Sequence, residues 1–287
     1  MGLMSVTTVL LVLLAALLHA SWNAFAKTGS NPTLSIACFH VVAAVIAAPI
    51  IFLVPLPNTE SIPYLLASVV MHWAYMSLLG KAYKVGDLSH VYPLSRGTAP
   101  LIVTVVSTLI FKEVLPTLTV FGILLTCSGI ILLSFKNGLS LQQDRRAVAL
   151  SLGTSLSIAA YTIIDGLGVR HSMDPLSYII WLFALVGITF GFFTVFVRTE
   201  NPKQALRYFK QERWVMLTGG IATAGAYGIV IYAMDENPMA MVSTLRETSV
   251  LIGIIIGVAI LKERFGKMGM GAVVLVGTGV FIMNLVR

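Results

Sequence analysis

Two arginines lie inside long apolar stretches of this 287-residue chain: Arg96 and Arg246, separated by 150 positions. A charged side chain in a hydrocarbon environment costs about 2.5–3.5 kcal/mol or more unless it meets water or a partner. The planar guanidinium fork suits a carboxylate or a phosphonate. The two residues therefore predict an anchor for the anionic group of a small molecule, or else a buried ion pair with Glu247 or Asp165 as partner.

A polar stripe in the first apolar segment could line a cavity. His19, Trp22 and Asn23 follow i, i+3, i+4 spacing and so share one helix face. An aromatic ring among polar groups suits a cavity wall that contacts a substrate. The alternative is that these side chains only join helices, because interhelical hydrogen bonds contribute about 0.6 kcal/mol in membranes.

Two acidic residues are candidates for carrying a proton. Asp165 is the deepest isolated acid, one turn from Tyr161, and Glu247 adjoins Arg246. Asp165 is also within a turn of the expected helix end, where water could simply solvate it. Tyr75 and Tyr227 could stack against a substrate, with ordinary packing as the alternative.

The chain carries an internal repeat at an offset of 150 residues. The stretch beginning Arg96-Gly-Thr-Ala-Pro-Leu-Ile and the stretch beginning Arg246-Glu-Thr-Ser-Val-Leu-Ile share their Arg, Thr and Leu-Ile positions. Lys112-Glu113 and Lys262-Glu263 then coincide, as do Gly129 and Gly279. A repeat in a strongly hydrophobic chain is typical of transporters, whose sites lie where the two halves meet.

Composition places the chain in a bilayer, because 57% of its residues are hydrophobic and only 11% are charged, against about 25% charged in soluble domains. About 20 apolar residues span the hydrocarbon core, and by this measure we expect ten transmembrane helices. They lie near 3–26, 33–54, 62–83, 88–111, 117–135, 147–169, 175–197, 214–234, 238–261 and 268–286.

These segments predict an all-α membrane protein, because backbone groups in lipid must be satisfied within helices. The two units are a first five-helix repeat at 1–138 and a second at 139–287. Five is odd, so consecutive units must be inverted relative to each other, with a cavity between them near the midplane.

Several other classes of protein are excluded by their motifs. The sequence contains no Walker motif for ATP, and it lacks the spacings of intramembrane proteases, so we expect no enzyme activity. No cofactor or metal site is indicated. Nucleic-acid binding would need a basic face with stacking aromatics, which is not visible. A structural or regulatory membrane subunit remains the alternative to a transporter.

The chain resembles the drug/metabolite transporter superfamily, in particular its EamA-type ten-helix members. The residues that carry the resemblance are His19-Ala-Ser-Trp22-Asn23 with Lys27, the loop Gly86-Asp-Leu-Ser-His-Val, and the paired Lys-Glu ends. It implies a secondary transporter of small polar metabolites, such as an exporter of amino acids, that alternates access around a central cavity. It also implies a multi-pass protein of the bacterial-type inner membrane, as a monomer or a homodimer.

The orientation in the membrane stays open. Most Lys and Arg lie in the loops after odd-numbered segments, so the positive-inside rule places both termini outside the cytoplasm. The resemblance implies both termini inside.

Overall fold

The structure, a computed structural model, describes residues 4–28, 30–85, 88–134, 145–198, 202–261 and 266–285. Over these ranges the chain is helical and forms no β-strand, which confirms the all-helical prediction. The first half contains α1 (Val6–Thr28), α2 (Pro32–Ile50), α3 (Ile62–Val85), α4 (Leu88–Leu109) and α5 (Thr117–Leu133). The second half contains α6 (Arg145–His171), α7 (Pro175–Val186), η1 (Gly187–Phe192), η2 (Thr194–Arg198), α8 (Pro202–Gln211), α9 (Arg213–Glu236), α10 (Met239–Arg246), α11 (Ser249–Leu261) and α12 (Lys267–Met283).

Two helices in equivalent places of the halves begin in the same way. The Asn31 side chain caps α2 by accepting the Leu34 N–H, and the Asp174 side chain caps α7 by accepting the Leu176 N–H, both at 3.2 Å. A proline follows each cap at the first helical position, where its missing N–H costs nothing.

The segment expected at 175–197 is one rod made of α7 and the π-helical η1 and η2. A Cβ at Gly187 would lie 2.3 Å from the His40 carbonyl oxygen, and one at Gly191 would lie 3.1 Å from that of Ala37. Glycine is therefore needed where η1 packs against α2. The π-helical turns of η1, which are wider than α-helical turns, occur where the two helices approach closely.

The segment expected at 238–261 is not one helix. It is divided into α10 and α11 by a turn at Glu247 and Thr248. Leu245 lies just before the turn, and its carbonyl accepts both the backbone N–H of Thr248, at 3.2 Å, and the hydroxyl of Thr248, at 2.7 Å. The sequence contains no proline or glycine at this break, so it was not predicted. Discontinuous helices of this kind line binding sites in transporters.

Six helical segments in the described ranges are long and apolar enough to cross a membrane. They are α1, α2, α3, α6, the α7–η2 rod and α9. Thr117–Leu133 and Met268–Met283 form shorter apolar helices, and α4 has the length but a more polar composition. A multi-pass helical membrane protein is thus confirmed, while the count of ten crossings stays a prediction.

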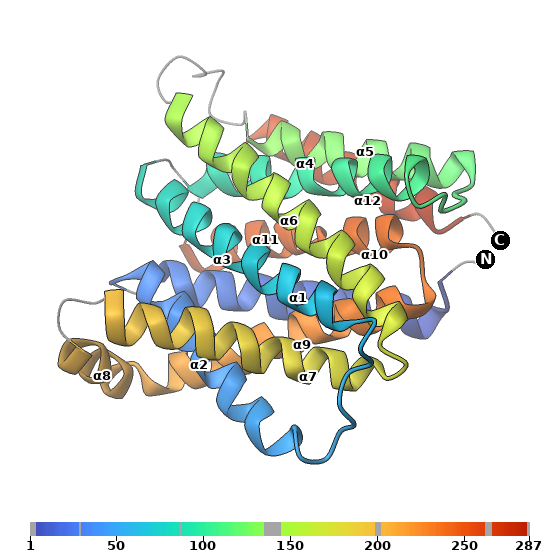
Figure 1. Cartoon of the computed structure of the whole chain (residues 1–287). Helices are drawn as coiled ribbons and strands as arrows, with labels where there is room; N and C mark the ends of the chain where they lie inside the picture. Colours follow the sequence, from blue (N-terminus) through green and yellow to red (C-terminus); the bar gives the residue numbers. More distant parts are fainter. Residues whose placement is uncertain are drawn as a thin grey trace.

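The helices form a bundle in which contacts between the halves are reciprocal (Figure 1). The α3–α6 contact has its counterpart in α9–α1, and the α4–α6 contact in α11–α1. The last helix of each half, α5 or α12, packs against the other, and the repeat-related Gly129 and Gly279 both lie in that contact. Such reciprocity is what a two-fold relation between two similar units produces.

The short helix α10 lies at the centre of the bundle, where it contacts α1, α4, α5, α6 and α9. All eight of its residues are buried. The start of α1 and the end of α12 lie on the same side of the bundle in Figure 1, opposite to α8. The polar residues that the sequence singled out surround α10.

Candidate functional site

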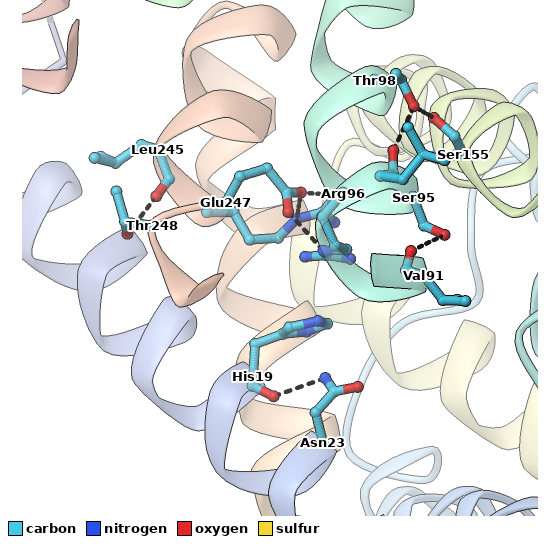
Figure 2. Close-up of polar contacts among 12 residues, drawn as sticks. His19, Asn23, Val91, Ser95, Arg96, Thr98, Ser155, Leu245, Glu247 and Thr248 are labelled. Atoms are coloured by element: carbon cyan, nitrogen blue, oxygen red, sulfur yellow. Dashed lines mark hydrogen bonds and ion pairs between the residues drawn. The ribbon is translucent and has the colours of Figure 1, made fainter. Parts of the chain in front are cut away.

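The centre of the bundle holds two arginines and one glutamate, from α4 and from the end of α10. Arg96, Arg246 and Glu247 are 2%, 1% and 0% exposed. The Nε of Arg96 lies 2.5 Å from Glu247 Oε2, while Arg246 donates to Glu247 Oε1 from Nε at 3.2 Å and from Nη2 at 3.1 Å. One carboxylate therefore joins the two repeat-related arginines, and Figure 2 shows Glu247 beside Arg96.

The break after α10 explains how Glu247 reaches both partners. Arg246 ends the helix and Glu247 is its C-cap, with its backbone N–H bonded to the carbonyl of Thr244. Of the two interpretations of the arginines, the ion pair with Glu247 is present, and the structure shows no ion pair between Asp165 and either arginine. With all three groups ionised, the cluster carries one net positive charge.

The stripe on α1 faces this cluster. The Trp22 indole N–H donates to His19 Nδ1 at 3.2 Å, and Asn23 Nδ2 donates to the His19 carbonyl at 2.9 Å. An indole nitrogen can only donate, so His19 Nδ1 must accept and the ring proton is on Nε2. The His19 ring extends toward Arg96 (Figure 2). The stripe thus presents an N–H donor to the arginine cluster.

Three buried donor atoms have no hydrogen-bond partner among the described residues and take no part in the contact between Arg96 Nε and Glu247 Oε2. They are Nη1 and Nη2 of Arg96 and Nε2 of His19. Arg96 Nε makes no hydrogen bond to a described residue either, so its contact with Glu247 Oε2 is an ion pair only. Buried polar groups in native proteins are almost always hydrogen-bonded to protein, water or ligand. Because all three are donors, the group that satisfies them must be an acceptor, and an anionic oxygen satisfies a guanidinium best.

The predicted tyrosines form an aromatic wall beside the cluster. The Tyr161 ring is 5.4 Å from that of Tyr75 and 5.3 Å from that of Tyr227. Arg246 Cζ lies 5.9 Å above the Tyr227 ring, within the range of a cation–π contact. His72, which no sequence pattern had singled out, stacks on Tyr161 with ring centroids 4.4 Å apart. Its signal was its position three residues before Tyr75, on the same helix face.

Asp165 belongs to a separate hydrogen-bonded group that borders this wall. It accepts the hydroxyl of Tyr178 at 3.0 Å and that of Tyr227 at 2.5 Å. Asp165 is fully buried, so the alternative that water solvates it near the helix end is wrong. Tyr227 connects the two groups, since its hydroxyl contacts Asp165 and its ring contacts Arg246. Tyr178, on α7, was also missed, because nothing in the sequence pairs it with α6.

A second ion pair lies on the side of the bundle on which α6 ends. Arg170 donates to Glu113 Oε1 at 2.9 Å, to the Asn237 carbonyl at 2.8 Å and to the Met234 carbonyl at 3.0 Å. Glu113 also accepts the Met239 backbone N–H at the start of α10. The repeat-related Lys262-Glu263, the Lys27 side chain and the start of the Gly86 loop lie outside the described residues.

Comparison with known proteins agrees with this architecture. The sequence matches the EamA-like transporter family twice, over residues 6–135 and 145–285. One similar solved structure, titled only as the crystal structure of a protein, has a TM-score of 0.75 and 14% sequence identity, and the match covers 97% of each chain. At that identity the similarity concerns the fold alone. No curated protein matches the sequence.

Proposed function

The chain belongs to the EamA-like transporter family, and on that premise we propose that it is a secondary transporter of small polar metabolites that carry an anionic group. Amino acids are the class we expect, with export as the direction. The observation that carries this proposal is the cluster of Arg96, Arg246 and Glu247, beside which buried donors of Arg96 and His19 have no partner in the described protein.

The proposed topology has ten membrane crossings in two inverted units, 1–138 and 139–287. The family match to both halves, the reciprocal contacts between them and the common side of the two termini support it. The site lies at the contact between the halves, where a rocking motion changes access from one side to the other. The membrane is the inner membrane of a bacterial-type cell, and the protein acts as a monomer or a homodimer.

In the proposed binding mode, Arg96 and His19 hold the anionic group while Trp22, Asn23 and Arg246 border it. The rings of Tyr75, Tyr161 and Tyr227 contact the remainder of the substrate. A hydrogen bond to a charged group contributes about 1.5–3 kcal/mol, so two such donors account for a large part of a micromolar affinity, which is about 8 kcal/mol.

Proton coupling is assigned to Asp165, with Glu247 as the second acid. Asp165 accepts the hydroxyl groups of Tyr178 and Tyr227 and forms no ion pair with a basic side chain among the described residues. A proton on Asp165 therefore removes a negative charge that no ion pair neutralises. The Tyr227 side chain connects that change to Arg246. This contact is a physical route from a proton site to the substrate site.

Flux into proteoliposomes tests the proposal. The purified chain is reconstituted, and saturable movement of radiolabelled amino acids and small carboxylates is measured with and without a pH gradient. We expect Arg96→Ala to raise the half-saturating concentration about tenfold or more, because a tenfold change corresponds to about 1.4 kcal/mol. Arg213→Ala, at an exposed arginine where α9 begins, is the matched control. Absence of saturable flux for every solute would reject transport and favour a structural or regulatory subunit.

A further inference from the structure

The two arginines do not hold Glu247 in the same way. Arg246 directs both Nε and Nη2 to the single oxygen Oε1, and the two residues are adjacent in the chain. Arg96 Nε meets Oε2 in an ion pair that lacks hydrogen-bond geometry, and its Nη1 and Nη2 also have no hydrogen-bond partner in the described part of the chain. The Arg246–Glu247 contact is local, whereas the Arg96–Glu247 contact joins α4 to α10 across the two halves.

A carboxylate is the natural partner of the donors that Arg96 and His19 leave open. Arg96 makes its strongest contacts when two parallel N–H groups meet two oxygens. Glu247 does not provide this arrangement, since it offers one oxygen to Arg96 and the other to Arg246. A solute carboxylate can meet Arg96 through two nitrogens and take the His19 N–H as well. It therefore satisfies more donors than Glu247 does.

We propose that Glu247 occupies the position at Arg96 that the substrate carboxylate takes, and that the site is built for a solute with one net negative charge. This inference rests on the proposed transport function and narrows its substrate class to acidic amino acids and other monoanions, because an amino acid with an uncharged side chain is a zwitterion without net charge at pH 7. On binding, the solute replaces Glu247 at Arg96, and Glu247 keeps its contacts with Arg246.

The charge of the cluster sets the charge of the solute. Two guanidinium groups and one carboxylate leave one positive charge, and one bound monoanion neutralises it. A dianion leaves one excess negative charge buried within the bundle, which is costly without a partner. The site binds a dianion only if Glu247 takes up a proton. Binding of a doubly charged solute therefore requires one proton more than binding of a singly charged one.

Replacement of Glu247 also has a mechanical consequence. The Arg96–Glu247 contact holds α4 against the end of α10, and these elements come from different halves. A solute that takes over Arg96 removes this bond between the halves. Binding therefore favours the movement that transport needs, in the way that a ligand shifts an equilibrium toward the state it binds better.

Matched probes that differ in one charge test the inference. We would measure dissociation constants at pH 7 for the monoamides of C4 to C6 dicarboxylates, which carry one charge, and for the parent dicarboxylates, which carry two. The full chain in detergent is used, with ligand-induced thermal stabilisation as the readout. Wild type is expected to bind the monoamides about tenfold or more tightly than the dicarboxylates, the fold-change that about 1.4 kcal/mol produces.

The variants separate charge from shape. Glu247→Gln keeps the size of the side chain but raises the net charge to two, so the preference should invert toward the dicarboxylates. Glu247→Asp keeps the wild-type preference. The double variant Arg246→Gln/Glu247→Gln returns the cluster to one positive charge on Arg96 and should restore the preference for the monoamides. The double variant also tests the charge assignment if Glu247→Gln alone does not fold.

Equal binding of the two probe series by wild type, an unchanged preference in Glu247→Gln, or no binding of either series would overturn the inference. Flux of the same probes in proteoliposomes distinguishes this failure from that of the proposed function. Probes that bind with the expected preference but do not cross the membrane contradict transport and leave the charge assignment intact. If the probes are transported but wild type and Glu247→Gln show the same preference between monoamides and dicarboxylates, the result contradicts the charge assignment alone.

Discussion

Glu113 and Arg170 lie 57 residues apart in the chain, yet their side chains form an ion pair of 2.9 Å that joins the two halves at one side of the bundle. The pair is partly shielded, with Arg170 22% and Glu113 6% exposed. Because Glu113 also accepts the first N–H of α10, it connects this ion pair to the helix that carries Arg246.

Loss of this connection should destabilise the fold. Glu113→Ala removes the anion and leaves the α10 N–H groups and Arg170 with fewer partners, so we expect the free energy of unfolding to fall by about 1–3 kcal/mol. Thermal unfolding of the purified protein measures this, with Glu60→Ala, at an exposed loop acid, as the control. Equal melting temperatures for the two variants would show that the pair contributes nothing.

Close packing at η1 predicts a sharp difference between two glycines. Gly187→Ala places a methyl group 2.3 Å from the His40 carbonyl oxygen and 2.4 Å from Ala44 Cβ, so α2 and η1 must separate. We expect a loss of about 1–3 kcal/mol, the usual cost of overpacking. Gly253→Ala is the control, because no atom lies within 4 Å of the added Cβ. The same observation shows that Gly253 makes no close helix contact in this structure. If both variants are equally stable, Gly187 is not packed tightly against α2.

The Tyr227 hydroxyl can be separated from the Tyr227 ring. Tyr227→Phe removes the hydrogen bond to Asp165 and keeps the aromatic ring beneath Arg246. We expect substrate affinity within about threefold of wild type, since a loss of about 0.6 kcal/mol or less is involved, while the stimulation of flux by a pH gradient falls. Asp165→Asn should have the same effect. Full stimulation by the gradient in both variants would remove Asp165 from the coupling.

The tautomer of His19 depends on Trp22. Trp22→Phe keeps an aromatic ring but removes the N–H that His19 Nδ1 accepts. His19 Nε2 is then no longer fixed as a donor. We expect substrate binding to weaken about three- to tenfold, because the variant removes the neutral Trp22–His19 hydrogen bond, which contributes about 0.5–1.5 kcal/mol to holding the donor tautomer. Dissociation constants measure the change, and Trp214→Phe, at an exposed tryptophan, is the control. Unchanged affinity would mean that His19 does not donate to the substrate.

Features of the chain that depend on local patterns were predictable from the sequence. The apolar segments, the proline-led starts of α2 and α7 and the repeat of the two arginines follow from hydropathy and spacing, and the structure contains each of them. The break at Glu247 was not predictable, because Glu247 and Thr248 have no helix-breaking side chains. The wrong expectation of one continuous helix over 238–261 has this cause.

The sequence by itself determined that the chain is a helical membrane protein of two related halves and that its two arginines need partners. Only the tertiary structure decided which acid serves them. Glu247 and Asp165 were equally possible partners along the chain, since side-chain contact between helices depends on their rotation and depth, which packing sets. The turn after α10 directs Glu247 to both arginines, whereas α7 and α9 bring tyrosine hydroxyls to Asp165.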